Sequence, residues 1–297
     1  MDTIGTITEL REVLDADRAA GASVGFVPTM GYLHEGHVSL VRASVAANDR
    51  TVVSIFVNPL QFAPDEDLAD YPRDLAADSA SCEVAGVDYV FAPSVDEMYP
   101  EPVDTVVAVP GVAAPLEGVH RPTHFAGVAT VVAKLFSIVG PCRAYFGAKD
   151  WQQVAVVSRM VGDLSMPIEV VACPIVREAD GLAMSSRNVY LTDEERVQAP
   201  LLRRALDAGL AAIATGEREP AAVEKIMAAV LADAALGTVD YCAAVPAHSL
   251  VVAGPLVGQV RLLLAVRFSK ARLIDNDGCV IDGHEVRSQK QDSRGSG

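Results

Sequence analysis

The stretch FVPTMGYLHEGHVSLV (26–41) holds two histidines, three residues apart, where a predicted strand turns into a predicted helix. The strand ends at Pro28, a glycine-containing turn follows, and the helix begins near Gly36. Because residues three apart share one face of a helical turn, His34 and His37 can point to the same side. A helix N-terminus also offers unpaired amide donors and a partial positive charge. The spacing therefore favours a cradle for the phosphates of a nucleotide.

Two other interpretations of this histidine pair are open. In the first, one histidine caps the helix and the other is solvated, which is the commoner outcome for an H-x-x-H spacing taken by itself. In the second, the pair ligates a metal ion. However, HEGH lacks the HExxH spacing of zinc proteases, and no third ligand is evident in the sequence. The strand–turn–helix context favours the nucleotide interpretation.

The segment AMSSRNVYL (183–191) is a second candidate, because its side chains suit a triphosphate. Ser185 and Ser186 supply hydroxyl donors, and the guanidinium of Arg187 is a fork-shaped cation. Alone, this segment would be an ordinary polar loop. Together with HEGH it is more specific, since HxGH followed at a distance by a Met-Ser-rich loop resembles the HIGH and KMSKS signatures of the nucleotidyltransferase superfamily.

A third candidate, FGAKDWQQV (146–154), places a charged pair at the end of a predicted strand. Lys149 could neutralise phosphate charge at a transferring group, and Asp150 could accept hydrogen bonds from a ribose. The alternative is a turn with an exposed salt bridge. The other two motifs favour the nucleotide role.

Polar residues in two further segments could border the same site. Asn58 and Gln61 follow a predicted strand among apolar residues, where their amides would suit a small hydroxy acid or belong to an ordinary loop. The basic RPTHF (121–125) is compatible with either a helix cap or the edge of a pocket.

The elements that must position these residues alternate between strands and helices. Buried strands are predicted from short apolar runs at 23–29, 51–58, 87–93, 142–148 and 168–176. Helical patterns lie between them at 38–48, 73–86, 125–139 and 150–164. Such alternation indicates an α/β fold, a Rossmann-like parallel sheet with helices on both faces. Sheets of this kind bind ligands beyond the carboxyl ends of their strands, at the switch in strand order.

The alternation of strands and helices ends at about residue 176. Two amphipathic helices are predicted over 194–215 and 221–234, followed by strands within 239–245, 259–268 and 271–276. This pattern indicates a smaller α+β domain. We therefore expect a nucleotide-binding domain over 1–176, a C-terminal lid domain over 177–286, and an unstructured polar tail over 287–297.

Composition excludes several classes of protein. A net charge of −15 argues against a protein that wraps nucleic acid, because phosphate contacts need clustered Lys and Arg. No apolar run approaches the ~20 residues of a membrane span, and the charged N-terminus does not resemble a signal peptide. The 5 cysteines show no CxxC pair, which suggests reduced, mostly buried thiols. We expect a soluble cytoplasmic protein.

Seven segments together resemble one family. They are PTMGYLHEGH, SIFVNPLQF, YPRDL, RPTHFAGVATVV, FGAKDWQQ, READGLAMSSRN and RLIDN, in this order, across roughly residues 26–276. The chain resembles the pantothenate synthetases, also called pantoate–β-alanine ligases. The resemblance implies ATP- and Mg²⁺-dependent condensation of (R)-pantoate with β-alanine through a pantoyl-adenylate, with release of AMP and pyrophosphate. It also implies a Rossmann-like domain, a C-terminal lid and a homodimer.

The resemblance further implies a role for individual residues. The ATP site would take Met30, Gly31, Tyr32, Leu33, His34, Glu35, Gly36, His37, Gly147, Ala148, Lys149, Asp150, Val176, Met184, Ser185, Ser186 and Arg187. His37, His34 and Lys149 would be catalytic. Gln61 and Gln153 would hold pantoate, and Gln61 would also border β-alanine. Asp78 stands where the family has a carboxylate linked to magnesium.

Three positions depart from the family pattern. Ala148 replaces an acid in GEKD, and Trp151 replaces the tyrosine of DYQQ. Ala77 reduces the acidic pair beside Asp78, which bears on the magnesium contact. The competing functions are a nucleotidyltransferase that acts on another small metabolite and a non-catalytic ATP-sensing module. The amides of Gln61 and Gln153, with Lys149 and His37 all present, favour the ligase.

Overall fold

The computed structural model describes residues 1–62, 68, 71–283 and 285–288. It divides into two compact units. The N-terminal unit comprises Met1–Ala148 and Gln152–Cys173, and the C-terminal unit comprises Lys149–Trp151 and Pro174–Gly297.

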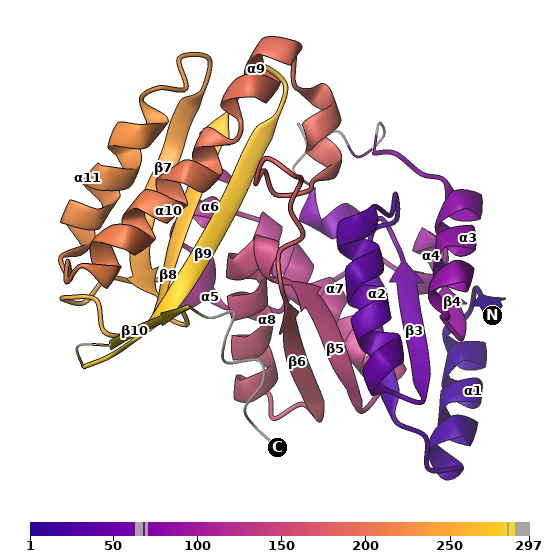
Figure 1. Cartoon of the computed structure of the whole chain (residues 1–297). Coiled ribbons are helices and arrows are strands. Elements are labelled where there is room, and N and C mark those ends of the chain that lie inside the picture. The colour runs from indigo at the N-terminus through magenta and orange to yellow at the C-terminus, as the bar shows by residue number, and fades with distance from the viewer. Residues whose placement is uncertain (63–67, 69–70, 284, 289–297) are drawn as a thin grey trace. The chain divides into compact units, whose positions relative to one another are not determined.

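The N-terminal unit is built on a six-stranded sheet with the order β1-β4-β3-β2-β5-β6 (Figure 1). Its strands are β1 (Asp2–Ile4), β2 (Val24–Thr29), β3 (Arg50–Ile55), β4 (Tyr89–Phe91), β5 (Cys142–Gly147) and β6 (Ile168–Cys173). All neighbouring pairs are parallel, which confirms the predicted parallel sheet. The short β1 was not anticipated, because only Ile4 of its three residues is buried and no apolar pattern marks it.

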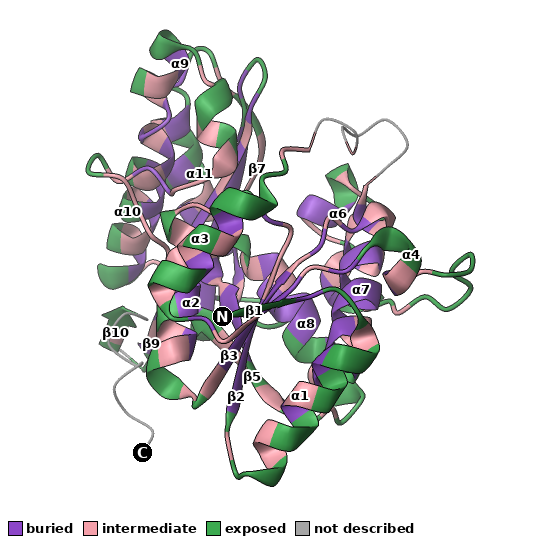
Figure 2. Cartoon of the chain, turned by 90° about the vertical axis from the view of Figure 1, so that its right-hand side faces the viewer, coloured by how far each residue is buried: buried purple, intermediate pink, exposed green. Residues whose placement is uncertain are grey.

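Helices cover both faces of this sheet, as predicted (Figures 1 and 2). The helices are α1 (Ile7–Ala19), α2 (Glu35–Ala47), α3 (Leu75–Ala85), α4 (Val95–Met98), α5 (Pro110–Ala113), α6 (Glu117–His120), α7 (His124–Val139) and α8 (Trp151–Asp163). In Figure 2, α2 and α3 lie on one side of the strands, and α1, α7 and α8 lie on the other. This division follows from right-handed crossovers, because the chain runs from β2 through β3 to β4 in one direction and from β5 to β6 in the other.

The switch in strand order lies at β2, which pairs with β3 on one side and with β5 on the other. The register with β5 sets Phe26 opposite Ala144, and both side chains are fully buried. The carboxyl ends of β2 and β5 therefore lie side by side. The turn after Thr29 and the segment after Gly147 leave the sheet from neighbouring strands, which is where such folds bind ligands.

The C-terminal unit holds a four-stranded antiparallel sheet with the order β10-β9-β8-β7. Its strands are β7 (Thr238–Pro246), β8 (Gly258–Arg267), β9 (Arg272–Asp282) and β10 (Glu285–Ser288). The helices α10 (Leu201–Ala214) and α11 (Pro220–Leu231) pack on it, and Leu206, Met227 and Leu262 share the core. This unit confirms the predicted smaller α+β fold.

Two details of this unit differ from expectation. The predicted helix over 194–215 is broken into α9 (Asp193–Gln198) and α10, because Pro200 lacks the N–H that a continuous helix needs. Arg287 and Ser288 were expected in the unstructured tail but pair with β9 as part of β10. The rest of that tail, 289–297, lies outside the described residues. Among the described residues, no helix is long and apolar enough to cross a membrane.

Candidate active site

The turn between β2 and α2 is held by one buried carboxylate. Gly31 and Tyr32 both have positive φ, 83° and 53°, which tightens the turn. Asp78 of α3, only 3% exposed, accepts the N–H groups of Tyr32 (2.8 Å) and Leu33 (2.7 Å). A Cβ at Gly31 would lie 2.8 Å from the Asp78 oxygen, so only glycine fits there. The turn is thereby fixed by a residue that is remote in sequence.

The two histidines cap α2 reciprocally. His34 Nδ1 accepts the N–H of Gly36 (3.1 Å), and His37 Nδ1 accepts the N–H of His34 (3.3 Å). Since both Nδ1 atoms act as acceptors, each neutral ring carries its proton on Nε2. The ring centroids are 4.2 Å apart, so the two Nε2–H groups are donors from neighbouring rings. Helix capping is therefore present, and its hydrogen bonds use the Nδ1 atom of each ring.

Gly36 is required by this arrangement. A Cβ at Gly36 would lie 2.8 Å from Cε1 of His34 and 2.9 Å from its Nδ1. The glycine of HxGH thus makes room for the first imidazole. Glu35, which lies between His34 and Gly36 in the sequence, is exposed and forms an ion pair with Arg42.

Gln61 lies within hydrogen-bonding distance of the turn and is held from several sides. Its Nε2 is 2.6 Å from Sδ of Met30, and its Oε1 accepts from Asn58 (3.3 Å). Asn58, 1% exposed, also donates to Gly127 O (3.2 Å) and accepts from the Tyr99 hydroxyl (2.9 Å). Burial raises the pKa of Tyr99 to about 12, so its phenol stays a donor at neutral pH. The structure thus brings the predicted amide beside the start of the predicted nucleotide turn.

The RPTHF segment is a neighbour of this amide pair. His124 Nδ1 lies 3.1 Å from Gln61 O, and a guanidinium nitrogen of Arg121 lies 3.4 Å from the same oxygen. Thr123, at the N-cap of α7, makes no side-chain capping bond. Two side chains of this segment therefore contact the backbone of Gln61.

The two adjacent glutamines of α8 have different surroundings. Gln152, 3% exposed, donates to Val112 O (2.9 Å) and Pro115 O (2.7 Å) and accepts from Glu117 N (3.1 Å). It therefore holds the loop before α6. Gln153 is half-buried, and its side chain makes no hydrogen bond with another described residue. Its amide is thus available to a ligand.

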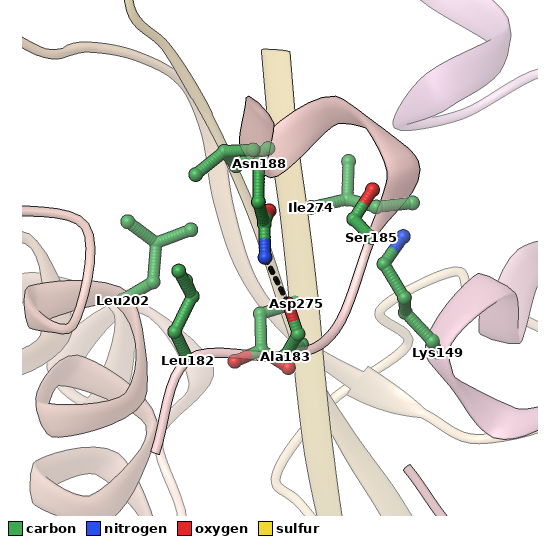
Figure 3. Close-up of a pocket in the computed structure, with 9 residues that line it drawn as sticks. Lys149, Leu182, Ala183, Ser185, Asn188, Leu202, Ile274 and Asp275 are labelled. Atoms are coloured by element: carbon green, nitrogen blue, oxygen red, sulfur yellow. Dashed lines mark hydrogen bonds between the residues drawn. The ribbon is translucent and has the colours of Figure 1, made fainter. Parts of the chain in front are cut away.

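In the C-terminal unit, Lys149 lines a small pocket together with Ser185 and Asn188 (Figure 3). In this view Lys149 and Ser185 lie on one side of the pocket, and the apolar Leu182 and Leu202 lie on the other. Lys149 Nζ is 3.6 Å from Asp150 Oδ1, and its side chain is only 16% exposed. The predicted cation and the predicted Met-Ser loop therefore share one pocket.

The Met-Ser loop is pinned by its own backbone and by one asparagine. Met184 N–H donates to Val176 O (3.0 Å), and Ser185 Oγ accepts the N–H of Arg187 (3.2 Å). Asn188 donates to Glu178 Oε1 (2.8 Å) and Ala183 O (3.1 Å). Sequence reasoning missed Asn188, although it ends the MSSRN motif. Arg187 is exposed at the surface of the loop, with Ser186 half-buried beside it.

The remaining predicted residues fall at the carboxyl end of β5. Gly147 is the last residue of β5, and Ala148 is 8% exposed. The predicted site residues are thus divided between the two units: 30–37, Gln61, Asp78, Gly147, Ala148 and Gln153 in the first, and Lys149, Asp150, Val176 and 184–187 in the second.

Known proteins resemble this chain over nearly its whole length. The sequence profile of the family described as pantoate-beta-alanine ligase matches residues 2–277. A pantothenate synthetase of Sinorhizobium medicae (strain WSM419) is 54% identical over 277 residues, 93% of this chain and 95% of that protein. One from Caldicellulosiruptor bescii is 50% identical over 276 residues, 93% of this chain and 98% of that protein.

Solved structures agree with the fold. A crystal structure of pantothenate synthetase from Thermus thermophilus has a TM-score of 0.87 and 50% identity, covering 93% of this chain and 98% of that one. Pantoate-beta-alanine ligase from Francisella tularensis, solved in complex with beta-gamma ATP and beta-alanine, has a TM-score of 0.74 and 31% identity, covering 93% and 97%. By sequence and by fold, this chain belongs to the pantoate–β-alanine ligase family.

Proposed function

We propose that this chain condenses (R)-pantoate with β-alanine, using ATP, and releases pantothenate, AMP and pyrophosphate. The observation that carries the proposal is the arrangement at the carboxyl end of β2. There the Asp78-held turn presents two Nε2–H donors and brings Met30 to the amide of Gln61. The imidazole N–H donors suit the phosphates of a nucleotide, and the amide of Gln61 beside them suits a small hydroxy acid.

We assign the nucleotide to residues 30–37, Gly147–Asp150, Val176 and Met184–Arg187. His34, His37 and Lys149 act on the phosphates. Gln61 and Gln153 hold pantoate, and Gln61 also borders β-alanine. Support comes from the donor geometry of the histidines, from the shared pocket of Lys149 and Ser185, and from the availability of Gln153.

The proposed reaction has two steps. A carboxylate oxygen of pantoate attacks the α-phosphorus of ATP, and pyrophosphate leaves. The amine of β-alanine then attacks the carbonyl carbon of the pantoyl-adenylate, loses a proton and expels AMP. The chain's own part is to orient the in-line attack and to stabilise negative charge on the phosphates, which the imidazole N–H donors and Lys149 can do.

Magnesium is implied by the resemblance, and Asp78 is its expected contact. The described residues do not fit a protein-built site for it. They hold no group of three or more His, Cys, Asp or Glu that could bind a metal, and both oxygens of Asp78 already accept backbone N–H bonds. No step is therefore assigned to the metal, and the magnesium role of Asp78 stays a prediction.

We also propose a cytoplasmic homodimer with a nucleotide-binding domain over 1–176 and a lid over 177–286. The resemblance to the family supports these assignments. Sedimentation velocity of the purified chain measures the assembly, and a species with the 31.3 kDa mass of one chain would contradict the dimer.

Isotope exchange tests the proposed activity. Labelled pyrophosphate should enter ATP when pantoate is present and β-alanine is absent, because adenylate formation is reversible and precedes the amine. With β-alanine added, AMP and pantothenate should form in equal amounts. Exchange that requires β-alanine, or formation of ADP, would contradict the adenylate route. A product that keeps the nucleotide would instead identify a nucleotidyltransferase.

A further inference from the structure

The segment Lys149–Trp151 follows a strand of the N-terminal unit but is held by side chains of the C-terminal sheet. Asn276 of β9, 1% exposed, donates from Nδ2 to the carbonyl of Lys149 (2.8 Å). Arg261 of β8, 5% exposed, donates to Oδ1 of the same asparagine (3.1 Å). One buried amide therefore joins a buried guanidinium to the backbone of the candidate catalytic lysine.

Trp151 closes this arrangement into a ring. The guanidinium carbon of Arg261 lies 3.5 Å from the centroid of the indole, a close cation–π stack. The indole Nε1–H donates to Ala247 O (2.7 Å), and this hydrogen bond fixes the plane of the indole. The contacts run from Lys149 to Asn276, to Arg261, to Trp151 and back along the chain to Lys149.

This closed set of contacts has an energetic cost, because it buries the charged guanidinium of Arg261. The cost indicates that the contacts do more than stabilise the sheet. Burial lowers the pKa of Arg261 to about 10, with the charge of Asp277 acting in the opposite direction. The guanidinium therefore keeps its charge at neutral pH although it is removed from water, where its desolvation is unfavourable. A plain apolar core would hold the sheet at lower cost, whereas a charged stack also fixes the orientation of the indole.

We propose that Trp151, Arg261 and Asn276 are positioning residues, which fix the backbone at Lys149 so that its ammonium is presented to the pocket shared with Ser185. The inference rests on the proposed role of Lys149 at the phosphates of ATP. None of the three residues lines that pocket. We therefore expect their effect on the reaction to pass through Lys149.

Kinetics of the full-length enzyme test this dependence. Arg261→Met and Asn276→Ala should each lower kcat about 10-fold or more, because misplacing a catalytic group by ~1 Å can cost ~100-fold. In the Lys149→Ala background the same changes should alter kcat by less than about 2-fold, the non-additivity expected when residues act through one group. Full activity of the single variants, or equal losses in both backgrounds, would overturn the proposal.

Trp151 gives a second readout, because it is the only tryptophan in the chain. Asn276 does not stack on the indole, but it accepts a hydrogen bond from Arg261, which does. Asn276→Ala should therefore loosen Arg261 and change the fluorescence emission of Trp151. Arg272→Met is the matched control: Arg272 lies on β9 over the ring of Tyr241 at 5.9 Å, and its loss should leave both emission and kcat unchanged. Unchanged emission in Asn276→Ala would overturn the proposal.

Two further results separate this inference from the proposed function. If Lys149→Ala is fully active, the assignment of Lys149 fails. The emission alone then decides whether Arg261 and Asn276 hold Trp151 in place.

If Arg261→Met or Asn276→Ala prevents folding, Trp151→Phe and Trp151→Leu are used in place of that variant. Phe keeps a π face and should retain kcat within about 3-fold, whereas Leu removes the stack and should not. Equal activity of the two would overturn the proposal.

Discussion

At the scale of single residues, the side chains proposed to act on the substrates are oriented by neighbours to which no chemical role is assigned. The imidazoles of His34 and His37 are oriented by backbone N–H groups, which occupy both Nδ1 atoms. Gln61 is oriented by Asn58, which is in turn held by Tyr99. Charge stabilisation by such fixed donors needs no reorganisation during the reaction, which is why it accounts for large rate effects.

We expect His37→Ala and Lys149→Ala each to lower kcat by ~100-fold or more while the fold stays intact, because each removes a preorganised donor or cation. Steady-state assays and circular dichroism on the purified variants measure this. His248→Ala and Lys225→Ala are controls, since both residues are exposed in the C-terminal unit. Near-normal turnover in either test variant would contradict the assignment.

Asp78→Asn tests whether this residue holds the turn. An Asn side chain has one oxygen, so an NH₂ group must face one of the two N–H groups of Tyr32 and Leu33, at a cost of about 1–3 kcal/mol. We expect a lower Tm, lower kcat and only a modest change in the magnesium requirement. Asp74→Asn is the control, because Asn caps a helix as well as Asp does. Full recovery of activity at high magnesium would show a metal role instead.

Sequence reasoning identified the candidate site residues but not most of the residues that hold them in place. The H-x-x-H spacing and the strand–turn–helix context predicted that His34 and His37 face one way, and the ring distance agrees. It did not predict that Asp78 holds the turn. Asp78 is 46 residues from Tyr32 and 45 residues from Leu33, and only the packing of α3 on α2 brings them together. The same holds for Asn58 with Tyr99.

At the scale of elements, apolar patterning predicted five of the six parallel strands, because strands buried on both faces are nearly continuous apolar runs. It also predicted α2, α3, α7 and α8, but not the four-residue helices α4, α5 and α6 between β4 and β5. It missed β1, which is too short, and α1, whose charged surface hides the buried Leu10 and Leu14. The break at Pro200 was overlooked because the amphipathic pattern continues across it, although the proline itself is the signal.

Gly36→Ala should damage the start of α2. The added Cβ would lie 2.8 Å from the His34 ring, so the imidazole must move and its capping bond is lost. We expect kcat to fall by ~10-fold or more and the Tm to fall. Gly162→Ala on α8 is the matched control: nothing lies within 4 Å of its added Cβ, and Ala favours a helix by about 0.5–1 kcal/mol. A fully active Gly36→Ala would contradict the capping account.

The N-terminus of α9 should respond to acid. The N–H groups of Thr192 and Ser269 donate to Glu195 and hold its pKa below the usual value of 4.5. A carboxylate with a lowered folded pKa stabilises the fold fully above the unfolded pKa, and this stabilisation is lost as pH falls below about 4.5. Glu195→Gln should therefore lower the Tm at pH 7 and flatten its decline between about pH 5 and 3. An unchanged pH profile would contradict this role.

At the scale of the whole molecule, the two units carry different parts of the proposed chemistry. The N-terminal unit holds the imidazole donors and the amides proposed for pantoate, and the C-terminal unit holds Lys149 and the Met-Ser loop. The sequence indicated both folds, because the apolar runs of the parallel sheet stop near residue 176 and two amphipathic helices follow. It did not indicate that Lys149–Trp151 packs on the C-terminal sheet, since the partners Arg261 and Asn276 lie over 100 residues away.

In the proposed mechanism, pantoate is activated by attack of its carboxylate on the α-phosphorus of ATP. Transfer of oxygen-18 from pantoate to AMP tests this step. A labelled carboxylate oxygen becomes the bridge to phosphorus, and attack of the amine breaks the bond between the acyl carbon and that oxygen. Mass spectrometry should therefore find one labelled atom in AMP for each pantothenate formed. Unlabelled AMP from a reaction that still makes pantothenate would contradict the account, even if all three substrates are correct.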